Sequence, residues 1–269
     1  MRRLVRLTGG TADPVWRATL GDGREVVVKA AADAPQGKFE TEAEGLRVLA
    51  DLGGLPTVEV VAVTPRSIVL DALDPESPLD DEFWADAGRR VAELHGVRGE
   101  RHGWSHDGWL GRLPQHNAWD ADGYRFFAEN RVLRYLPEPG VEASLDASER
   151  RGIERICERL PELVPDHGPR LTHGDLWRNN LLRGRAGEPV FMDPAVSYAW
   201  AEVDLSMILS SGGVPDSFFA AYGEVRPLDR EWREHARILN LRQLLALLAF
   251  FGPNPVFIEP VRSLIADYA

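Results

Sequence analysis

This chain of 269 residues has little cysteine, little lysine and no long apolar run. Its one cysteine, Cys157, cannot form an intramolecular disulfide or a multi-thiolate zinc site, and it falls on the apolar face of a predicted helix. We therefore expect it to pack in a core, in a reducing compartment. No segment approaches the roughly 18 apolar residues that cross a bilayer, and the N-terminus lacks a signal-peptide core, so a cytoplasmic protein is expected.

Acidic residues outnumber basic ones, which gives a formal net charge of −11 at pH 7. A surface this acidic repels phosphate backbones and anionic lipids, so we expect neither nucleic acid nor a membrane as a partner. It would attract a cationic small molecule. The hydrophobic share of 44% is enough for a globular core. The sequence leaves the oligomeric state open, with a monomer as the expectation.

The chain has a strand-rich first part and a helix-rich second part. Residues 15–30 predict a β-hairpin around an Asp-Gly turn, followed by a helix over 37–54 and two short strands. After a connector rich in Pro and Asp come five helical patterns, over residues 81–97, 121–136, 146–160, 202–210 and 230–252. Short apolar pieces interrupt the helical part between Leu171 and Asp193. The pattern predicts an α+β fold of two lobes, with a cleft where they meet.

The scarcity of lysine makes Lys29 informative. The chain has only two lysines, Lys29 and Lys38, and uses arginine for its other basic residues. Lys29 ends the apolar run "EVVVK" of a predicted strand, where a buried cation needs an anionic partner. In the helix that follows, Glu42 lies at the edge of the apolar face and is the acid placed to reach Lys29. Glu40 and Glu44 are predicted to face solvent.

A second polar motif lies in "LTHGDLWRNN", residues 171–180. It places Asp175 and Asn180 in the pattern H-x-D-L-x-x-x-N, and Asp193 follows the short strand "PVFM". Transfer of a γ-phosphoryl group needs an acid that orients the attacking hydroxyl and accepts its proton, and oxygen ligands for Mg²⁺. Asp175 fits the first role, while Asn180 and Asp193 fit the second.

The chain order of these residues is the order of a kinase: strand lysine, helix glutamate, H-x-D…N, then a strand-terminal aspartate. The glycine-rich loop is the weak member of the set, because "LTGGTADPVW" has only Gly9 and Gly10 in place of G-x-G-x-x-G. Backbone N–H groups there, together with Thr11, could still cover phosphates.

Four segments resemble the fructosamine kinase (ketosamine 3-kinase) family within the aminoglycoside-phosphotransferase-like kinases: "HGDLWRNN", "FMDPAVSYAWAEVDLSM", "GWSHDGWLGRLPQHNAW" and "FFAENRVL". The resemblance extends over nearly the whole chain, and its family specificity rests on "HGDLW" and "GWLGRLPQHN". It implies a protein-kinase-like fold. Residues 1–73 would be the nucleotide-binding lobe, and residues 74–269 the catalytic and substrate lobe.

The resemblance also implies an activity. ATP and Mg²⁺ would be used to phosphorylate the 3-hydroxyl of a ketosamine, which is a sugar joined to an amine by non-enzymatic glycation, either free or on a protein. The product would then decompose and free the amine, so that the enzyme repairs glycated molecules.

Site roles carried over by position follow the motif residues already named. Asp175 looks like the catalytic carboxylate, Lys29 the phosphate-binding lysine with Glu42 as its partner, and Asn180 and Asp193 the metal ligands. Substrate contacts are implied for Trp177 and Tyr198, because an aromatic face suits both a sugar ring and an ammonium group. Structural support is implied for His173 and Asp204.

Two departures from the family pattern leave the sugar open. Asn179 stands where the family commonly has Gly, and "SYAWAEVD" differs from the more usual sequence around Tyr198. An aminoglycoside or choline-type small-molecule kinase of the same superfamily therefore remains an alternative. A kinase-shaped module without turnover is disfavoured, because Lys29, Asp175, Asn180 and Asp193 are all present.

Overall fold

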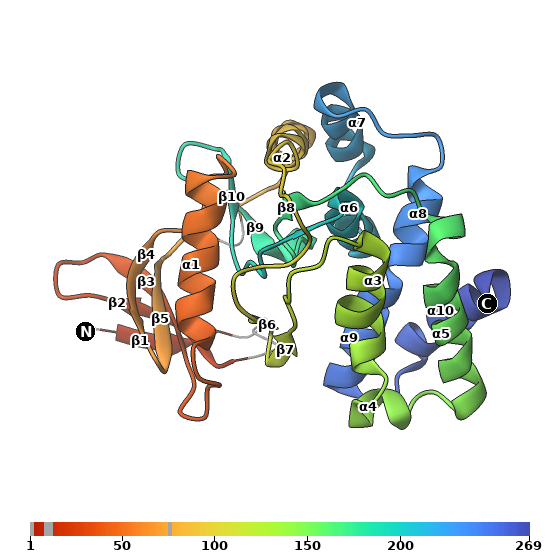
Figure 1. The fold of residues 1–269 in the computed structure, drawn as a ribbon. Coiled ribbons are helices and arrows are strands. Elements are labelled where there is room, and N and C mark those ends of the chain that lie inside the picture. Colours follow the sequence, from red (N-terminus) through yellow and green to blue (C-terminus); the bar gives the residue numbers. More distant parts are fainter. Residues whose placement is uncertain (1–2, 8–12, 75–76) are drawn as a thin grey trace.

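The computed structural model describes residues 3–7, 13–74 and 77–269. Figure 1 shows an antiparallel sheet with one long helix on one side of the molecule, and a larger, mainly helical part on the other. The predicted α+β class is therefore confirmed. The boundary predicted after residue 73 stays a prediction.

The N-terminal sheet has five antiparallel strands in the order β1-β2-β3-β5-β4. Its elements are β1 (Arg3–Arg6), β2 (Val15–Thr19), β3 (Glu25–Ala30), α1 (Lys38–Asp51), β4 (Val60–Thr64) and β5 (Ser67–Asp71). The predicted hairpin is the β2–β3 pair, in which Val15 lies opposite Lys29. Helix α1 covers the sheet, with Phe39, Ala43 and Leu46 packed against apolar strand residues. The predicted hairpin, helix and two following strands all form.

A strand from the second half of the chain completes this core. In β10 (Pro189–Phe191), Val190 packs with the side chains between α1 and the sheet. The backbone of Phe191 is bonded on both sides to the segment before β4, at 2.8 Å to Pro56 and 3.1 Å to Val58. The two parts of the molecule are therefore joined by main-chain bonds two residues before Asp193.

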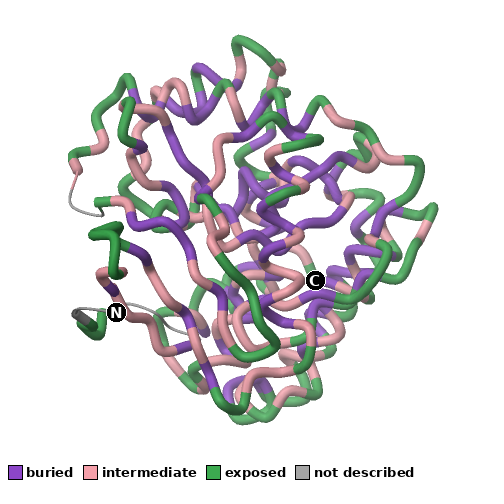
Figure 2. Tube along the Cα trace, turned by 90° about the vertical axis from the view of Figure 1, so that its left-hand side faces the viewer, coloured by how far each residue is buried: buried purple, intermediate pink, exposed green. Residues whose placement is uncertain are grey.

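The second part is built from helices and short two-stranded pairs. Its helices are α2 (Asp81–Leu94), α3 (Gly123–Phe127), α4 (Pro139–Glu142), α5 (Ala147–Leu163), α6 (Ala201–Ser210), α7 (Asp216–Val225), α8 (Trp232–Leu239), α9 (Leu241–Phe251) and α10 (Pro255–Tyr268). The strand pairs are β6 (Gly108–Leu110) with β7 (Leu113–Gln115), β8 (Arg170–Thr172) with β11 (Ser197–Ala199), and β9 (Leu181–Arg183) with β10. Figure 2 shows the buried residues gathered along the inner faces of these elements.

Two predicted helices are wrong as single elements. Residues 121–136 form α3, then a π-helical turn (Ala128–Val132) and a 3₁₀ turn (Leu133–Tyr135). The π turn carries Arg131, whose buried side chain donates to the carbonyl of His116 at 2.5 Å. Residues 230–252 form two helices, since α8 packs on α6 whereas α9 packs on α4 and α10. Within the described residues, no helix has the length and apolar character needed to span a bilayer.

The helix around Cys157 matches the expectation. It begins with a capping box in which the Asp146 side chain accepts from the N–H groups of Ser148 and Glu149, while Glu149 bonds back to the Asp146 backbone. Cys157 is buried in the helical core. Burial raises the pKa of its thiol to about 12, so the side chain stays protonated and packs as an apolar group.

The close approach of α2 and α7 gives a stability prediction. A Cβ atom added at Gly88 of α2 would lie 2.1 Å from the backbone oxygen of Phe218, whereas one added at Gly223 of α7 would meet nothing within 4 Å. Gly88→Ala should therefore lower the free energy of unfolding by about 1–3 kcal/mol through overpacking. Gly223→Ala, also helical, should be neutral or stabilising by up to about 1 kcal/mol. Urea denaturation measures both, and equal effects would contradict the predicted packing constraint.

Candidate active site

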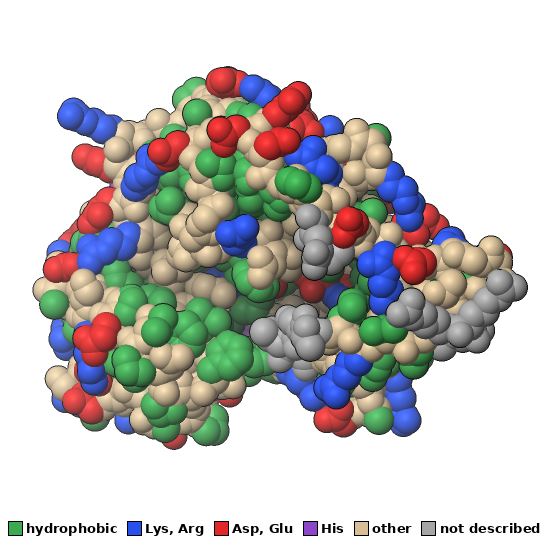
Figure 3. Space-filling view, turned by 180° about the vertical axis from the view of Figure 1, so that it is seen from behind, with side chains coloured by type: hydrophobic (Ala, Val, Ile, Leu, Met, Phe, Trp, Pro, Cys, Tyr) green, Lys and Arg blue, Asp and Glu red, His purple; other side chains and the backbone are tan. Residues whose placement is uncertain are grey.

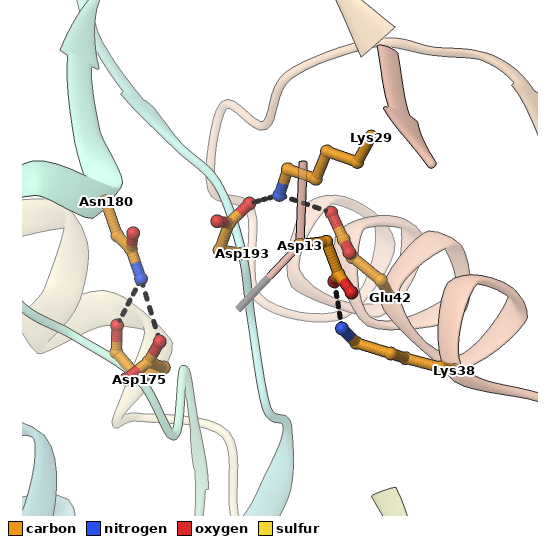
Figure 4. A network of polar contacts seen from close by, with 7 residues as sticks. All are labelled: Asp13, Lys29, Lys38, Glu42, Asp175, Asn180 and Asp193. Carbon is orange, nitrogen blue, oxygen red and sulfur yellow. Dashed lines mark hydrogen bonds and ion pairs between the residues drawn. The ribbon is translucent and has the colours of Figure 1, made fainter. Parts of the chain in front are cut away.

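Lys29, Glu42 and Asp193 meet where the sheet joins the helical part. The Lys29 ammonium donates to Oε1 of Glu42 at 2.8 Å and also to the carboxylate of Asp193, which lies 164 residues further along the chain. Figure 4 shows the lysine held between these two acids. The side chains of Lys29 and Glu42 are nearly buried, at 9% and 13% exposure, whereas Asp193 is 35% exposed. The exposed edge of the cluster is therefore on the Asp193 side.

The charge of Lys29 is fixed by its two partners. Burial alone would lower its pKa, but attraction to Asp193 and Glu42 outweighs burial and raises the pKa above the ordinary lysine value. The side chain is thus a permanent cation at physiological pH. A compact ammonium in this position can contact phosphate oxygens.

Asp193 has a backbone conformation that L-residues seldom adopt. Its φ is +56°, the one positive φ among the non-glycine residues that the structure describes. The residue before it is tied to the opposite loop, because the N–H of Met192 donates to the carbonyl of Asn180 at 3.0 Å. Left-handed backbone at a non-glycine residue is strained and persists where neighbouring contacts fix it, which is common at functional positions.

Asp175 and Asn180 face each other across the loop that follows β8. The Asn180 amide nitrogen donates to the main-chain oxygen of Asp175 at 2.8 Å and to its Oδ2 at 3.1 Å. Burial raises the pKa of Asp175 to about 7, although the positive charge of Arg242 opposes this rise. A carboxylate with a pKa near neutrality is suited to accepting a proton from a hydroxyl.

The side chain of Asp204 anchors the loop that carries Asp175. This fully buried carboxylate accepts from the N–H groups of His173 at 2.7 Å and Gly174 at 2.9 Å. The oxygen that accepts from His173, Oδ2, also lies 3.2 Å from Nε2 of His95, whose Nδ1 lies 2.9 Å from the Tyr222 hydroxyl. These contacts fix the backbone immediately before Asp175.

Two features of this loop follow from its tight packing. Gly174 has φ +79°, and a Cβ there would lie 1.9 Å from the backbone oxygen of Ala195, so no larger residue fits. The ring of His173 is buried, and burial lowers its pKa, which keeps it neutral. Its Nδ1 lies 3.3 Å from the N–H of Asp175 and can accept from it.

Several residues of this environment were not found from the sequence. The ring of His95, which the sequence did not mark as part of the site, links Asp204 to Tyr222. Arg242 of α9, only 2% exposed, donates to the Gln115 side chain at 3.1 Å, and Gln115 donates to the Ala195 carbonyl at 2.9 Å. Gln115 lies in the segment "LPQHN", which contributed to the family resemblance but indicated no structural role for this residue. Nothing in the sequence pointed to Arg242.

The predicted aromatic contacts lie in different surroundings. The Tyr198 ring is 5.5 Å from that of Trp104 and 6.4 Å from that of Trp119. Trp104 also donates to Glu44 of α1 at 3.3 Å. Glu44, which was predicted to face solvent, is therefore only partly exposed: its side chain is 38% exposed, and Trp104 and His106 of the second part contact it. Trp177, which lies two residues after Asp175, is half-buried. Substrate roles for Trp177 and Tyr198 stay predictions.

Asn180 and Asp193 fit a magnesium ion by their chemistry. The Asn180 nitrogen is directed at Asp175, so its amide oxygen is the atom left for a cation. One oxygen of Asp193 bonds to Lys29, and the residue is partly exposed. A carboxylate and an amide oxygen are suitable protein ligands for Mg²⁺ once phosphate oxygens and water complete the shell.

The residues predicted to cover the phosphates of ATP, Gly9, Gly10 and Thr11, lie outside the described residues.

The fold and these contacts place the chain in the protein-kinase-like class. Seen from behind in Figure 3, a hollow separates the two parts, and Asp and Glu atoms are visible inside it. The model of the fructosamine kinase family matches residues 1–268, and the chain belongs to that family.

Individual relatives agree with this assignment. A Thermus thermophilus protein named "Probable ketoamine kinase" is 35% identical over 249 residues, which cover 91% of this chain and 87% of the relative. The crystal structure of a "putative fructosamine-3-kinase" from Thermobifida fusca is 30% identical, with a TM-score of 0.87 and coverage of 98% and 93%. The amicoumacin kinase hAmiN, solved with AMP-PNP and Ca²⁺, shares the fold at 14% identity and a TM-score of 0.62, over 98% of this chain and 88% of its own.

The raised pKa of Asp175 predicts an effect on stability. Its folded-state pKa of about 7 exceeds the ordinary value of 3.8, so the ionised side chain destabilises the folded protein. The loss of folding free energy is largest above pH 7. It becomes smaller as the pH falls through 7 and is absent near pH 4. Asp175→Asn should therefore raise the melting temperature of the ligand-free protein at pH 8 by roughly 3 °C or more, and by less at pH 6.

Calorimetry at the two pH values provides the test. Asp216→Asn is the matched control, because the Asp216 side chain is 92% exposed and only forms a surface pair with Arg233. It should change the melting temperature little at either pH. A gain from Asp175→Asn that is the same at pH 8 and pH 6 would show that ionisation of Asp175 is not its cause.

Proposed function

We propose that this protein transfers the γ-phosphoryl group of ATP, with Mg²⁺, to the 3-hydroxyl of a ketosamine such as a fructosamine or ribulosamine. The observation that carries the proposal is the meeting of Lys29, Glu42 and Asp193 next to the Asp175–Asn180 pair. These residues come from a strand, a helix and two loops far apart in the sequence. Membership of the fructosamine kinase family supports the acceptor class.

The residues divide the work of the reaction. Lys29 binds phosphate oxygens of ATP, and Glu42 keeps it in place. Asp175 orients the acceptor hydroxyl and takes its proton as the oxygen attacks the γ-phosphorus and the bond to the β-phosphate oxygen breaks. Asn180 and Asp193 would hold Mg²⁺, which when bound neutralises charge on the phosphates. The products are the sugar 3-phosphate and ADP, with one proton released.

The acceptor is a small, amine-bearing sugar in this proposal. The net charge of −11 favours approach of a cationic molecule. Trp177, two residues after Asp175, offers an aromatic face for the sugar ring or its ammonium neighbour. A 3-phosphorylated ketosamine decomposes and releases the amine, so the physiological role would be repair of glycated amines.

Substrate trials test the acceptor. The protein is incubated with Mg·ATP and ribulose-lysine, fructose-lysine or kanamycin, and new sugar phosphates are followed by ³¹P NMR. A phosphate on carbon 3 of a ketosamine is the expected product. Phosphorylation of kanamycin alone would favour the aminoglycoside-kinase alternative and remove the ketosamine proposal.

The catalytic assignment predicts a separation of binding from turnover. Asp175→Asn should lower phosphotransfer at least 100-fold, because positioning and proton acceptance are both lost, while Mg·ATP binds with little change. Initial rates and isothermal titration measure the two quantities. Asp216→Asn serves again as the control and should retain the wild-type rate. Undiminished turnover by the Asp175 variant would show that another group accepts the proton.

A further inference from the structure

The second lysine of the chain, Lys38, is buried in the same way as the first. It is the first residue of α1, and its ammonium bonds to the carboxylate of Asp13. The two side chains are only 5% and 6% exposed. Within the described residues, the more exposed ion pairs use arginine or histidine, whereas both lysines stand in nearly buried pairs with carboxylates. The rarity that identified Lys29 in the sequence applies equally to Lys38.

Lys38 and Glu42 lie one helical turn apart on α1, so the two ion pairs are linked. The positive charge of Lys38 acts on Glu42 as well as on Asp13. Charges of alternating sign therefore run from the start of α1 into the active site, in the order Asp13, Lys38, Glu42, Lys29 and Asp193. Figure 4 shows the two ion-paired groups on the same helix.

Asp13 belongs to the strand side of this arrangement. The next residue, Pro14, accepts a bond from the N–H of Ala30 at 3.2 Å, and Val15 lies opposite Lys29 in the β2–β3 pair. Asp13 thus directly precedes two residues that pair with the strand carrying Lys29. The pair between Asp13 and Lys38 joins the start of α1 to that strand.

Among the residues that the structure describes, no capping side chain anchors the start of α1. Its N-cap is Gly37, with φ +79°, and no side chain caps the helix there. The first turn is therefore held by apolar packing, by main-chain bonds and by the ion pair of Lys38. A shift of this turn would move Glu42, one turn further on, relative to Lys29.

We propose that Lys38 and Asp13 form a positioning pair that sets the first turn of α1, so that Glu42 holds Lys29 in register with the phosphates of the nucleotide. The pair acts through Glu42 and Lys29 and does not touch the nucleotide itself. This inference rests on the proposed use of ATP. The pair would affect how tightly the phosphate groups of ATP bind, and it would leave binding of the nucleoside unchanged.

Nucleotide binding tests the pair without any acceptor. Lys38→Met and Asp13→Asn should each weaken binding of Mg·ATP about tenfold or more in isothermal titration, and leave adenosine binding within twofold of wild type. In assays with acceptor, the KM for ATP should rise and the KM for the acceptor should stay unchanged. The matched control is Arg112→Met, which removes the exposed pair of Arg112 with Asp33 near the same helix.

Rescue separates positioning from general stability. The conservative Lys38→Arg variant and the exchanged pair Asp13→Lys with Lys38→Asp should recover Mg·ATP affinity to within a few-fold of wild type, even if the single variants melt at lower temperature. Equal losses for Mg·ATP and adenosine, or no loss for either, would overturn the inference while leaving the proposed acceptor chemistry intact. Conversely, failure of every ketosamine in the substrate trials would not alter these binding results.

Discussion

A buried ammonium group links side chains from both parts of this molecule, in addition to the main-chain bonds of Phe191. Lys29 comes from the sheet, its partner Glu42 from the helix that covers the sheet, and its partner Asp193 from a loop of the helical part. A buried cation is costly unless it is paired and hydrogen-bonded, so the three groups stabilise one another only when the lobes meet in this geometry. The contact brings the sheet, α1 and the turn at Asp193 together at one edge of the site.

The active site combines rigid anchoring with local strain. Asp204 holds the backbone before Asp175, and the carbonyl of Ala195 leaves room only for glycine at position 174. Opposite this fixed loop, Asp193 keeps a left-handed backbone, and Asp175 is a carboxylate that burial has made hard to ionise. The left-handed backbone of Asp193 and the raised pKa of Asp175 each lower the stability of the folded chain, as is common for groups that bind phosphate or transfer a proton.

Local sequence patterns predicted most of the helices and strands, but not the positions at which two predicted helices are interrupted. The hairpin at 15–30, helix α1 and the capping box at Asp146 follow from turn residues, periodicity and side-chain caps, which are all encoded within a few positions. The π turn around Arg131 and the division between α8 and α9 depend on what each stretch packs against. Glu44 was placed in solvent because nothing on its own helix indicates that Trp104, 60 residues away, lies on that face.

By itself, the sequence determined the two-part α+β plan and the order of the kinase-like residues, and it singled out Lys29, since rarity, motif spacing and hydrophobic periodicity are properties of the chain. Tertiary structure decided which acid meets which base. Only folding showed that His95 supports Asp204, that Arg242 and Gln115 underlie the site, and that Lys38 is paired with Asp13. The physical reason is that burial and pairing energies depend on distances between segments far apart in sequence, which no local pattern records.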